Sequence, residues 1–335
     1  MACPILEDIV DDEVTIVRWA FRPQKVVRDR SDPLVFSDDY LIERYRFSGE
    51  GIRYLCGILG PKIQWRTARS RAMTVPQMVC VVLRFFASGS FLYSIGDAEN
   101  FNKGAVCRAI RDVYLALKSV VHIFVTFPGH RRLCYIKEGV YKIAAFPNVI
   151  GALDCTHVRI KRPSGVNEGD FVNRKSFHSI NVQMICDADC IFSNVEAKWP
   201  GSVHDARILR ASSIHQKLSQ GEFAGIILGD KGYACQPFLL TPFADPQGGA
   251  QMNFNLAHAR TRGRIEMAFG LLKTRFQCLC HLRVKPDRAC DIIVACTVLH
   301  NIAIIRRERA PRVALQMNWD NPAIFPDNVN DPRIS

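Results

Sequence analysis

The sequence lacks the features that mark secreted and membrane proteins. Its first residues, MACPILEDIVDDEV, are acidic and contain no apolar core followed by a small-residue cleavage site. No window reaches the roughly eighteen uninterrupted apolar residues that favour a membrane-spanning helix. We therefore expect neither secretion nor contact with a membrane.

Paired cysteine motifs are also missing. The 13 cysteines are scattered and form no C-x-x-C pair, so free thiols in a reducing compartment are expected in place of a disulfide framework. The nearest cluster is Cys278, Cys280 and His281, and it lacks a matching second half. A structural zinc site is therefore not expected.

Acidic residues are too few to balance the basic ones. The chain has 44 Lys and Arg against 32 Asp and Glu, a net charge of +12, with the excess concentrated in residues 255–290 and, less strongly, 103–137. Basic faces are often only solvated, but two clusters in a folded chain fit a track for a polyanion, and nucleic acid is the first candidate. The residues expected to contact DNA are basic and lie in or near these clusters: Lys103, Arg108, Arg111, Arg260, Arg262, Arg264, Lys273 and Arg275.

The length of 335 residues and the 48% hydrophobic content favour two domains of ordinary size. Residues 1–36 are predicted to form a loosely ordered lead-in, and the Pro- and Asn-rich residues 306–335 a weakly ordered tail. Between them, residues 37–140 have helical character, and from residue 146 to 305 strand patterns alternate with helical ones.

The helical part contains three segments with clear start or stop signals. Ser37 precedes a first helix, VPQMVCVVLRFFASGS ends at Gly89, and NKGAVCRAIRDVYLALKSVV places apolar residues on one face. Such a group fits a helix-turn-helix module with Lys103, Arg108 and Arg111 on the exposed side, and it equally fits a small helical bundle.

The second part predicts the order β, β, β, α, β. Its segments are VIGALDCTHVRI, SINVQMIC, CIFSNVEAKWP, SVHDARILRASSIHQKL and AGIILGD. A loop, ADPQGGAQMNFN, then leads to a long helix, RGRIEMAFGLLKTRFQCL, and a last apolar helix, DIIVACTVLHNIAII.

Three carboxylates stand at informative places in this pattern. Asp154 is near the end of the first strand, Asp230 follows the fourth, and Glu266 is in the first turns of the long helix. Asp230 alone is explained by a turn. If the first and fourth strands are neighbours, however, the acids gather, at a cost of several kcal/mol unless cations bind. Mg²⁺ or Mn²⁺ suits such oxygen ligands, and pairs of these ions serve phosphodiester cleavage.

Six motifs in this order resemble the PIF/Harbinger superfamily of DDE transposases, over roughly residues 37–305. They are VIGALDCTHVRIKRP, FVNRKSFHSINVQMICD, WPGSVHDARIL, ILGDKGY, GRIEMAFGLLKTRFQCL and VLHNIAI. The resemblance implies an α/β fold, in which a ribonuclease H-like catalytic domain, a mixed sheet flanked by helices, occupies residues 146–305. Its DDE triad corresponds to Asp154, Asp230 and Glu266. Residues 231 to 265, thirty-five in all, separate the last two acids, similar to the DD35E pattern.

The resemblance also implies an activity and partners. The activity is a metal-dependent DNA endonuclease, using two ions at the triad, with strand transfer of a freed 3′-hydroxyl in a full transposase. A helical DNA-binding domain would precede the catalytic one, and a separate Myb-like partner would assist DNA binding and nuclear import, so both nucleus and cytoplasm are expected locations. Self-association into a homo-oligomer is left open. Cys155 departs from many relatives, which carry Gly there.

Several residues keep two interpretations. Asp205 either completes a Ser-x-x-Asp capping pattern with Ser202 or supplies an extra metal ligand, and the domain order slightly favours the ligand. Lys231 either contacts phosphate or is solvated. His157 is more simply a satisfied histidine than a catalytic helper, and His300 a core residue.

Two functions from different classes remain open. The intact triad favours an active nuclease. A domesticated DNA- or protein-binding module could retain the same acids without using them.

Overall fold

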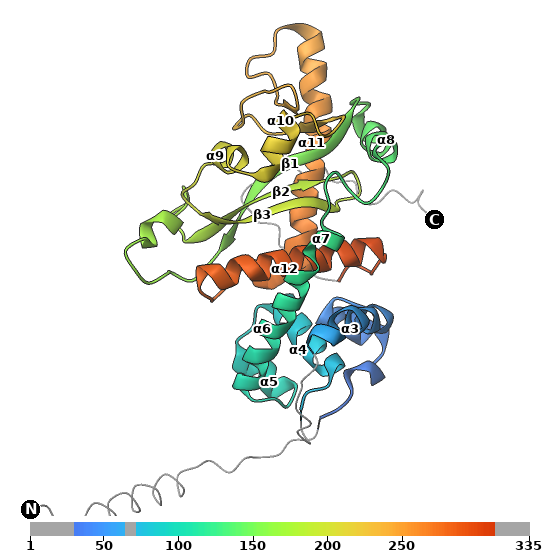
Figure 1. The fold of residues 1–335 in the computed structure, drawn as a ribbon, viewed down its shortest axis with the longest axis vertical. Coiled ribbons are helices and arrows are strands. Elements are labelled where there is room, and N and C mark those ends of the chain that lie inside the picture. Colours follow the sequence, from blue (N-terminus) through green and yellow to red (C-terminus); the bar gives the residue numbers. More distant parts are fainter. Residues whose placement is uncertain (1–29, 64–71, 312–335) are drawn as a thin grey trace, which may run out of the picture. The chain divides into compact units, whose positions relative to one another are not determined.

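The computed structural model describes residues 30–63 and 72–311 (Figure 1). The predicted lead-in, up to residue 29, and the predicted tail, beyond residue 311, lie outside the described residues. The chain divides into two compact units, Met1–Ser31 and Asp32–Ser335, and all elements below belong to the second.

Helices fill the first part of this unit. Ser37 caps α2 by accepting a hydrogen bond from the Tyr40 amide, and Gly89 ends α4 in the left-handed conformation, at φ 64°, as the sequence predicts. The predicted apolar face of α6 is buried. The elements are η1 (Pro33–Val35), α2 (Asp38–Tyr45), α3 (Gly49–Ile63), α4 (Val75–Ser88), α5 (Leu92–Ala98), α6 (Lys103–Ser119), α7 (Val121–Phe124) and α8 (Leu133–Ala144).

A mixed five-stranded sheet follows, with strand order β3-β2-β1-β4-β5. Its strands are β1 (Val149–Arg159), β2 (Ser179–Cys186), β3 (Phe192–Pro200), β4 (Ile226–Leu228) and β5 (Leu239–Leu240). The first three form an antiparallel meander, whereas β4 and β5 run parallel to β1. The first and fourth strands are therefore neighbours, which is the condition under which the acids were expected to gather.

Helices cover both faces of the sheet (Figure 1). The face that carries Val182 and Met184 packs against α11 (Gly248–Arg275) and α12 (Pro286–Ile305). The face that carries Leu153 and Ile185 packs against α9 (Asp205–Arg210) and α10 (Ser213–Ser219). Because side chains alternate along a strand, neighbouring residues of β1 serve opposite layers. The short 3₁₀ segments are η2 (Glu168–Phe171) and η3 (Gln277–Cys280).

Two helix predictions need correction. The segment predicted as one helix before β4 forms α9 and α10, because Ser212 caps a new helix by accepting from the His215 amide. The loop predicted at ADPQGGAQMNFN is mostly helix, since α11 begins at Gly248. Phe254 and Ala257 pack against the buried Val140 and Phe146, and this packing outweighs the glycine turn signal.

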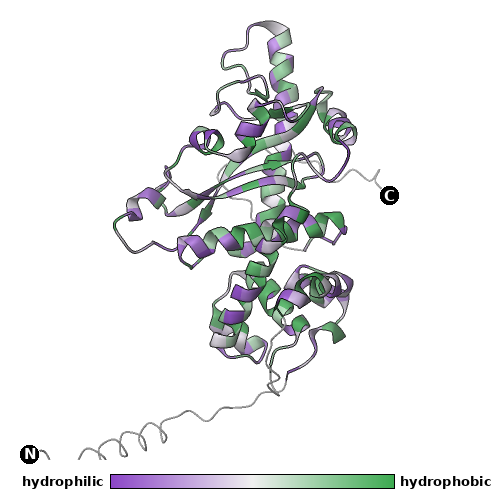
Figure 2. Ribbon diagram, in the orientation of Figure 1, coloured by the Kyte–Doolittle hydropathy of each residue, from purple (hydrophilic) through white to green (hydrophobic). Residues whose placement is uncertain are grey.

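The last helix, α12, connects the helical part with the sheet. It is long and apolar enough to cross a membrane by length and composition (Figure 2). However, 67% of that window is buried inside the fold, as in a core helix. One apolar cluster includes residues of α4, α6, β2 and α12. The Asn301 amide donates to the carbonyl oxygens of Phe124 and Phe192, both at 2.7 Å, and so ties α7 to β3.

His300, on the same helix, is fully buried, which confirms its prediction as a core residue. Its Nε2 lies 2.9 Å from the Cys190 carbonyl oxygen, and burial lowers the pKa of the imidazole from 6.5 to about 4. The folded chain therefore takes up this proton only at a lower pH than the unfolded chain does.

Substitution His300→Gln is expected to reduce the acid sensitivity of the fold. Below pH 6.5, His300 of the unfolded wild type binds a proton, whereas His300 of the folded protein stays neutral until the pH approaches 4. The free energy of unfolding therefore decreases as pH falls towards 4, by up to about 3 kcal/mol. Glutamine retains a donor for Cys190 and does not titrate. Urea unfolding at pH 7.5, 6 and 5 measures the difference, with exposed His122→Gln as control. Parallel pH profiles for wild type and His300→Gln would contradict this account.

Candidate active site

Asp154 and Asp230 lie side by side because of the β1–β4 register. Ala152 pairs with Leu228 across these parallel strands, and each acid follows its paired residue by two positions. β4 ends at Leu228, so the register brings the turn that carries Asp230 next to the part of β1 that carries Asp154, and the charge of Asp230 acts on Asp154. Asp154 is largely buried, with 18% of its side chain exposed.

The loop after β4 is shaped around Asp230. The Gly232 amide donates to Asp230 Oδ1 at 2.9 Å, and a Cβ at Gly232 would lie only 3.1 Å from the same oxygen. At Gly229 a Cβ would lie 3.0 Å from Leu239 and 3.1 Å from Tyr233. Two glycines therefore allow the carboxylate to leave a buried strand in a tight turn.

Arg262 links the first and third acids. Its Nη1 donates to Asp154 Oδ2 at 2.7 Å, and its Nη2 pairs with Glu266 Oε1, one turn further along α11. Because Asp154 and Met184 are directly paired neighbours, Asp154 is on the face that α11 covers. The helix thus brings Glu266 towards Asp154, as predicted, with a guanidinium between them.

The surroundings of Asp154 in the acid cluster, which consists of Asp154, Asp230 and Glu266, disfavour its ionised form. Burial raises the pKa of Asp154 to about 6, although Arg262 and the Cys155 amide favour its ionised form, and the carboxylates of Asp230 and Glu266 add to the rise. Three carboxylates (−3) and Arg262 (+1) leave a net charge of −2. Within the described part of the chain, Asp230 forms no ion pair.

The donor chemistry fits a divalent cation, since the three acids supply only carboxylate oxygens and carry excess negative charge. Their geometry in this structure is not that of a closed metal site. Among residues 30–63 and 72–311, no group of three or more His, Cys, Asp or Glu side chains is close enough to hold an ion. The guanidinium of Arg262 instead balances two of the acids.

Asp205 lies on the other face of the sheet. The first residue of α9 is Asp205 itself and its N-cap is His204, so the predicted capping pattern with Ser202 is wrong. Asp205 Oδ1 accepts from Asn181 Nδ2 at 2.8 Å, and Asn181 belongs to the row opposite that of Asp154. This placement does not support the expected metal-ligand role, because the sheet separates the two carboxylates.

The position of Asp205 reveals a polar group that sequence reasoning missed. The Cys155 thiol lies 3.3 Å from the Tyr233 hydroxyl, and burial, followed by the charge of Asp205, raises the pKa of that thiol well above its usual value. Cys155 follows Asp154 directly, and Tyr233 comes three residues after Asp230. This group therefore connects α9 to both acid-bearing segments from behind the sheet.

The expected DNA-contacting residues divide by burial. Lys273 and Arg275 are 8% and 5% exposed, so their expected place on a DNA track is wrong. Lys273 donates to Thr156 Oγ1 at 2.8 Å, and Arg275 to the Arg46 carbonyl at 3.0 Å. Arg262 is engaged by the acids, and Arg264 is half-buried. The exposed members are Lys103, Arg108, Arg111, Lys231 and Arg260.

His157 does not face the acids. Its Nδ1 lies 3.1 Å from Ser179 Oγ, within the row of side chains on the α9 side of the sheet. The structure thus favours the simpler interpretation, a histidine satisfied by hydrogen bonding.

Comparison with known proteins defines the class. A family model described as DDE superfamily endonuclease matches residues 153–301, which include all three acids. The chain therefore belongs to the DDE superfamily of endonucleases, as a nuclease of Harbinger transposase origin. DDE endonucleases generally depend on divalent metal ions.

Similar proteins occur in animals and plants. The chain is 35% identical over 274 residues to the Homo sapiens protein named "Putative nuclease HARBI1", covering 80% of this chain and 78% of that protein. The Xenopus laevis protein of the same name is 32% identical over 279 residues, covering 80% and 79%. Protein ALP1-like of Arabidopsis thaliana is 28% identical over 311 residues, covering 85% and 74%. No solved structure matches the chain.

Asp205→Asn is expected to lower stability without changing the dependence of cleavage on Mg²⁺ concentration. The substitution removes a charge-assisted hydrogen bond to Asn181, worth about 1.5 to 3 kcal/mol, but no group on the acid face. Thermal melting and a Mg²⁺ titration of cleavage check it, with exposed Asp170→Asn as control. An unchanged melting temperature together with a shifted Mg²⁺ midpoint would make Asp205 a ligand after all.

Proposed function

We propose that the chain hydrolyses phosphodiester bonds of DNA, with Asp154, Asp230 and Glu266 holding two divalent cations, Mg²⁺ or Mn²⁺. The observation that carries the proposal is the register of β1 with β4, because it brings the segments of Asp154 and Asp230 to one edge of the sheet while α11 adds Glu266. When bound, such ions activate water and stabilise the attacking and leaving oxygens of the phosphodiester.

The residues of the chain have separate tasks in this proposal. The carboxylates bind and orient, and Asp154 must be ionised to do so. Arg262 keeps Asp154 and Glu266 together before ions arrive, since it pairs with both. Lys231 is exposed and follows Asp230 directly, which supports a role in contacting a DNA phosphate. In a full transposase reaction, the freed 3′-hydroxyl would attack target DNA at the same acids.

DNA binding is proposed to use the helical part and the exposed basic residues. The helices α4, α5 and α6 follow one another with short turns, consistent with a helix-turn-helix module in residues 37–140 that precedes the nuclease domain in 146–305. The motif resemblance supports three further proposals: a Myb-like partner protein, residence in nucleus and cytoplasm, and a homo-oligomer.

A binding module without catalysis is the second candidate. The specific observation in its favour is that Arg262 pairs with two acids and that the carboxylates do not close around one point. Under this alternative, purified protein binds DNA but does not nick it, with or without a Myb-like partner.

Asp154→Asn, Asp230→Asn and Glu266→Gln are each expected to reduce Mg²⁺-dependent nicking of supercoiled plasmid by at least about a hundredfold. The melting temperature of Asp154→Asn should stay the same or rise, because burial disfavours the charge that is removed. Exposed Glu222→Gln is the matched control. Near wild-type nicking by any triad variant would remove that residue from the proposed ligand set.

Duplex DNA binding is expected to weaken steeply with salt. Single alanine substitutions at Lys103, Arg108, Arg111 or Arg260 should each reduce the log-log salt slope by about 0.9 if the side chain contacts one phosphate. Fluorescence anisotropy at several salt concentrations measures the slope, and exposed Lys217→Ala serves as control. A wild-type slope near zero would leave these residues as solvated surface.

A further inference from the structure

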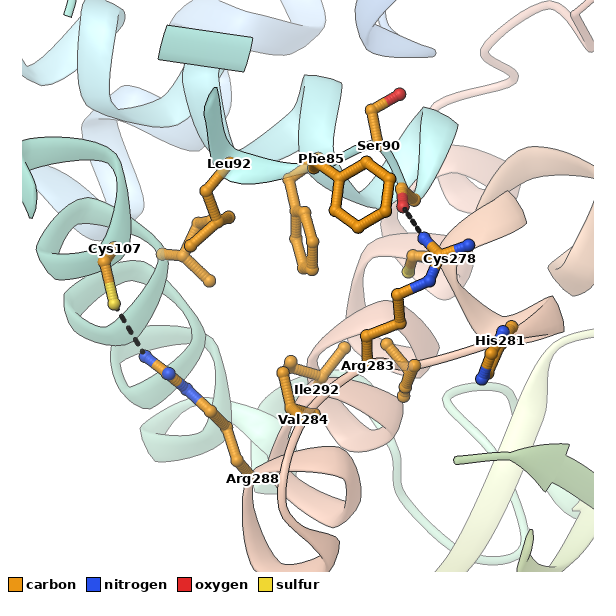
Figure 3. A pocket seen from close by; sticks show the side chains of 14 residues that line it. Phe85, Ser90, Leu92, Cys107, Cys278, His281, Arg283, Val284, Arg288 and Ile292 are labelled. Atoms are coloured by element: carbon orange, nitrogen blue, oxygen red, sulfur yellow. Dashed lines mark hydrogen bonds between the residues drawn. The ribbon is translucent and has the colours of Figure 1, made fainter. Parts of the chain in front are cut away.

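A pocket separate from the acid cluster lies where three segments meet (Figure 3). The end of α4 and the start of α5 form one wall, α6 a second, and the segment from η3 to α12 the third. The pocket encloses about 120 Å³, and its interior is mainly apolar, with side chains that include Phe85, Leu92, Ile110, Val284 and Ile292. An apolar cavity of about 150 Å³ holds benzene, so this one suits a single bulky side chain.

Two arginines stand at this pocket. Arg283 donates to the Gly89 carbonyl at 3.3 Å and lies over the Phe91 ring, and Arg288 donates to Cys107 Sγ at 3.7 Å (Figure 3). Neither guanidinium pairs with a carboxylate in the described part of the chain, and none of the described residues that line the pocket is acidic. Neither positive charge at this apolar pocket is therefore neutralised by a direct ion pair within the described structure.

The surface beside the pocket has the composition of a protein-binding site. Phe91, which lines it, is 64% exposed, and nearby Tyr93 is 63% exposed with the Lys103 ammonium 4.5 Å from its ring centre. Aromatic residues and arginine dominate the binding energy of protein interfaces, where an anchor side chain fills a pocket.

We propose that this pocket docks a partner protein through an acidic segment with one bulky apolar side chain. The apolar side chain enters among Leu92, Ile110 and Ile292, and flanking carboxylates pair with Arg283 and Arg288. A protein ligand is favoured over nucleic acid for two reasons. The apolar interior of the pocket offers a phosphate group no polar partners. The guanidinium of Arg283 also covers one face of the Phe91 ring, on which a nucleic-acid base would have to stack. The proposal does not depend on cleavage at the acid cluster.

The test measures binding of a labelled synthetic 12-residue peptide, a single phenylalanine flanked by glutamates and serines, to the full chain by fluorescence anisotropy. Arg283→Glu, Arg288→Glu and Phe91→Ala should each weaken binding about tenfold or more, about 1.4 kcal/mol at tenfold. Arg283→Gln, a milder change, should weaken it less than Arg283→Glu. Arg210→Glu and Tyr141→Ala are matched controls for exposed charge and exposed aromatic area and should bind as wild type.

Two altered peptides test whether binding requires the apolar side chain and the acidic residues. A peptide with alanine in place of phenylalanine should bind at least tenfold more weakly, and one with lysine in place of glutamate should not bind. The proposal is overturned if the glutamate peptide does not bind at millimolar concentration, or if the pocket variants leave its affinity unchanged. It is also overturned if a labelled 12-nucleotide single-stranded DNA loses affinity in the same variants while the peptide does not. Melting temperatures and plasmid nicking of each variant separate loss of docking from loss of fold or catalysis.

Discussion

The parallel pairing of β1 with β4 is the constraint on which the acid cluster depends. It fixes Ala152 opposite Leu228, and so brings Asp154 on β1 next to the turn after β4 that carries Asp230. A slip of one residue would move Asp154 to the opposite face of the sheet, away from α11. Burial of β4 between β1 and β5 holds this register, since Ile227 and Leu228 are fully buried.

Gathering the acids concentrates negative charge that the fold offsets only in part. Asp154 is buried enough for its pKa to rise to about 6, and Arg262 is the cation that balances it together with Glu266. Arg262 lies one turn before Glu266 on the same helix, and its pairing with both carboxylates keeps them close while it offsets part of their charge.

The two faces of the central sheet carry different polar side chains. The α11 side carries the acids, and the α9 side carries a partly buried polar group of Asp205, Cys155 and Tyr233 that joins the acid-bearing segments. On the α11 side, α12 continues the same apolar core into the helical part. The pocket that Arg283 and Arg288 line is formed there, between α12 and the helices α4, α5 and α6. One packed helix therefore joins the helical part to the sheet.

The sequence by itself determined the class of fold, the order of strands along the chain and the membership of the superfamily, because strand periodicity and ordered motifs are local properties of the chain. The sequence could not predict the burial or the partners of Arg262, Lys273 and Arg275, since all three belong to one basic cluster along the chain. Only the tertiary structure decided that Arg262 pairs with acids while the other two are buried, and that Asp205 lies behind the sheet. The physical reason is that burial and partners depend on which face of the sheet each helix covers, and this is set by packing between residues far apart in the sequence.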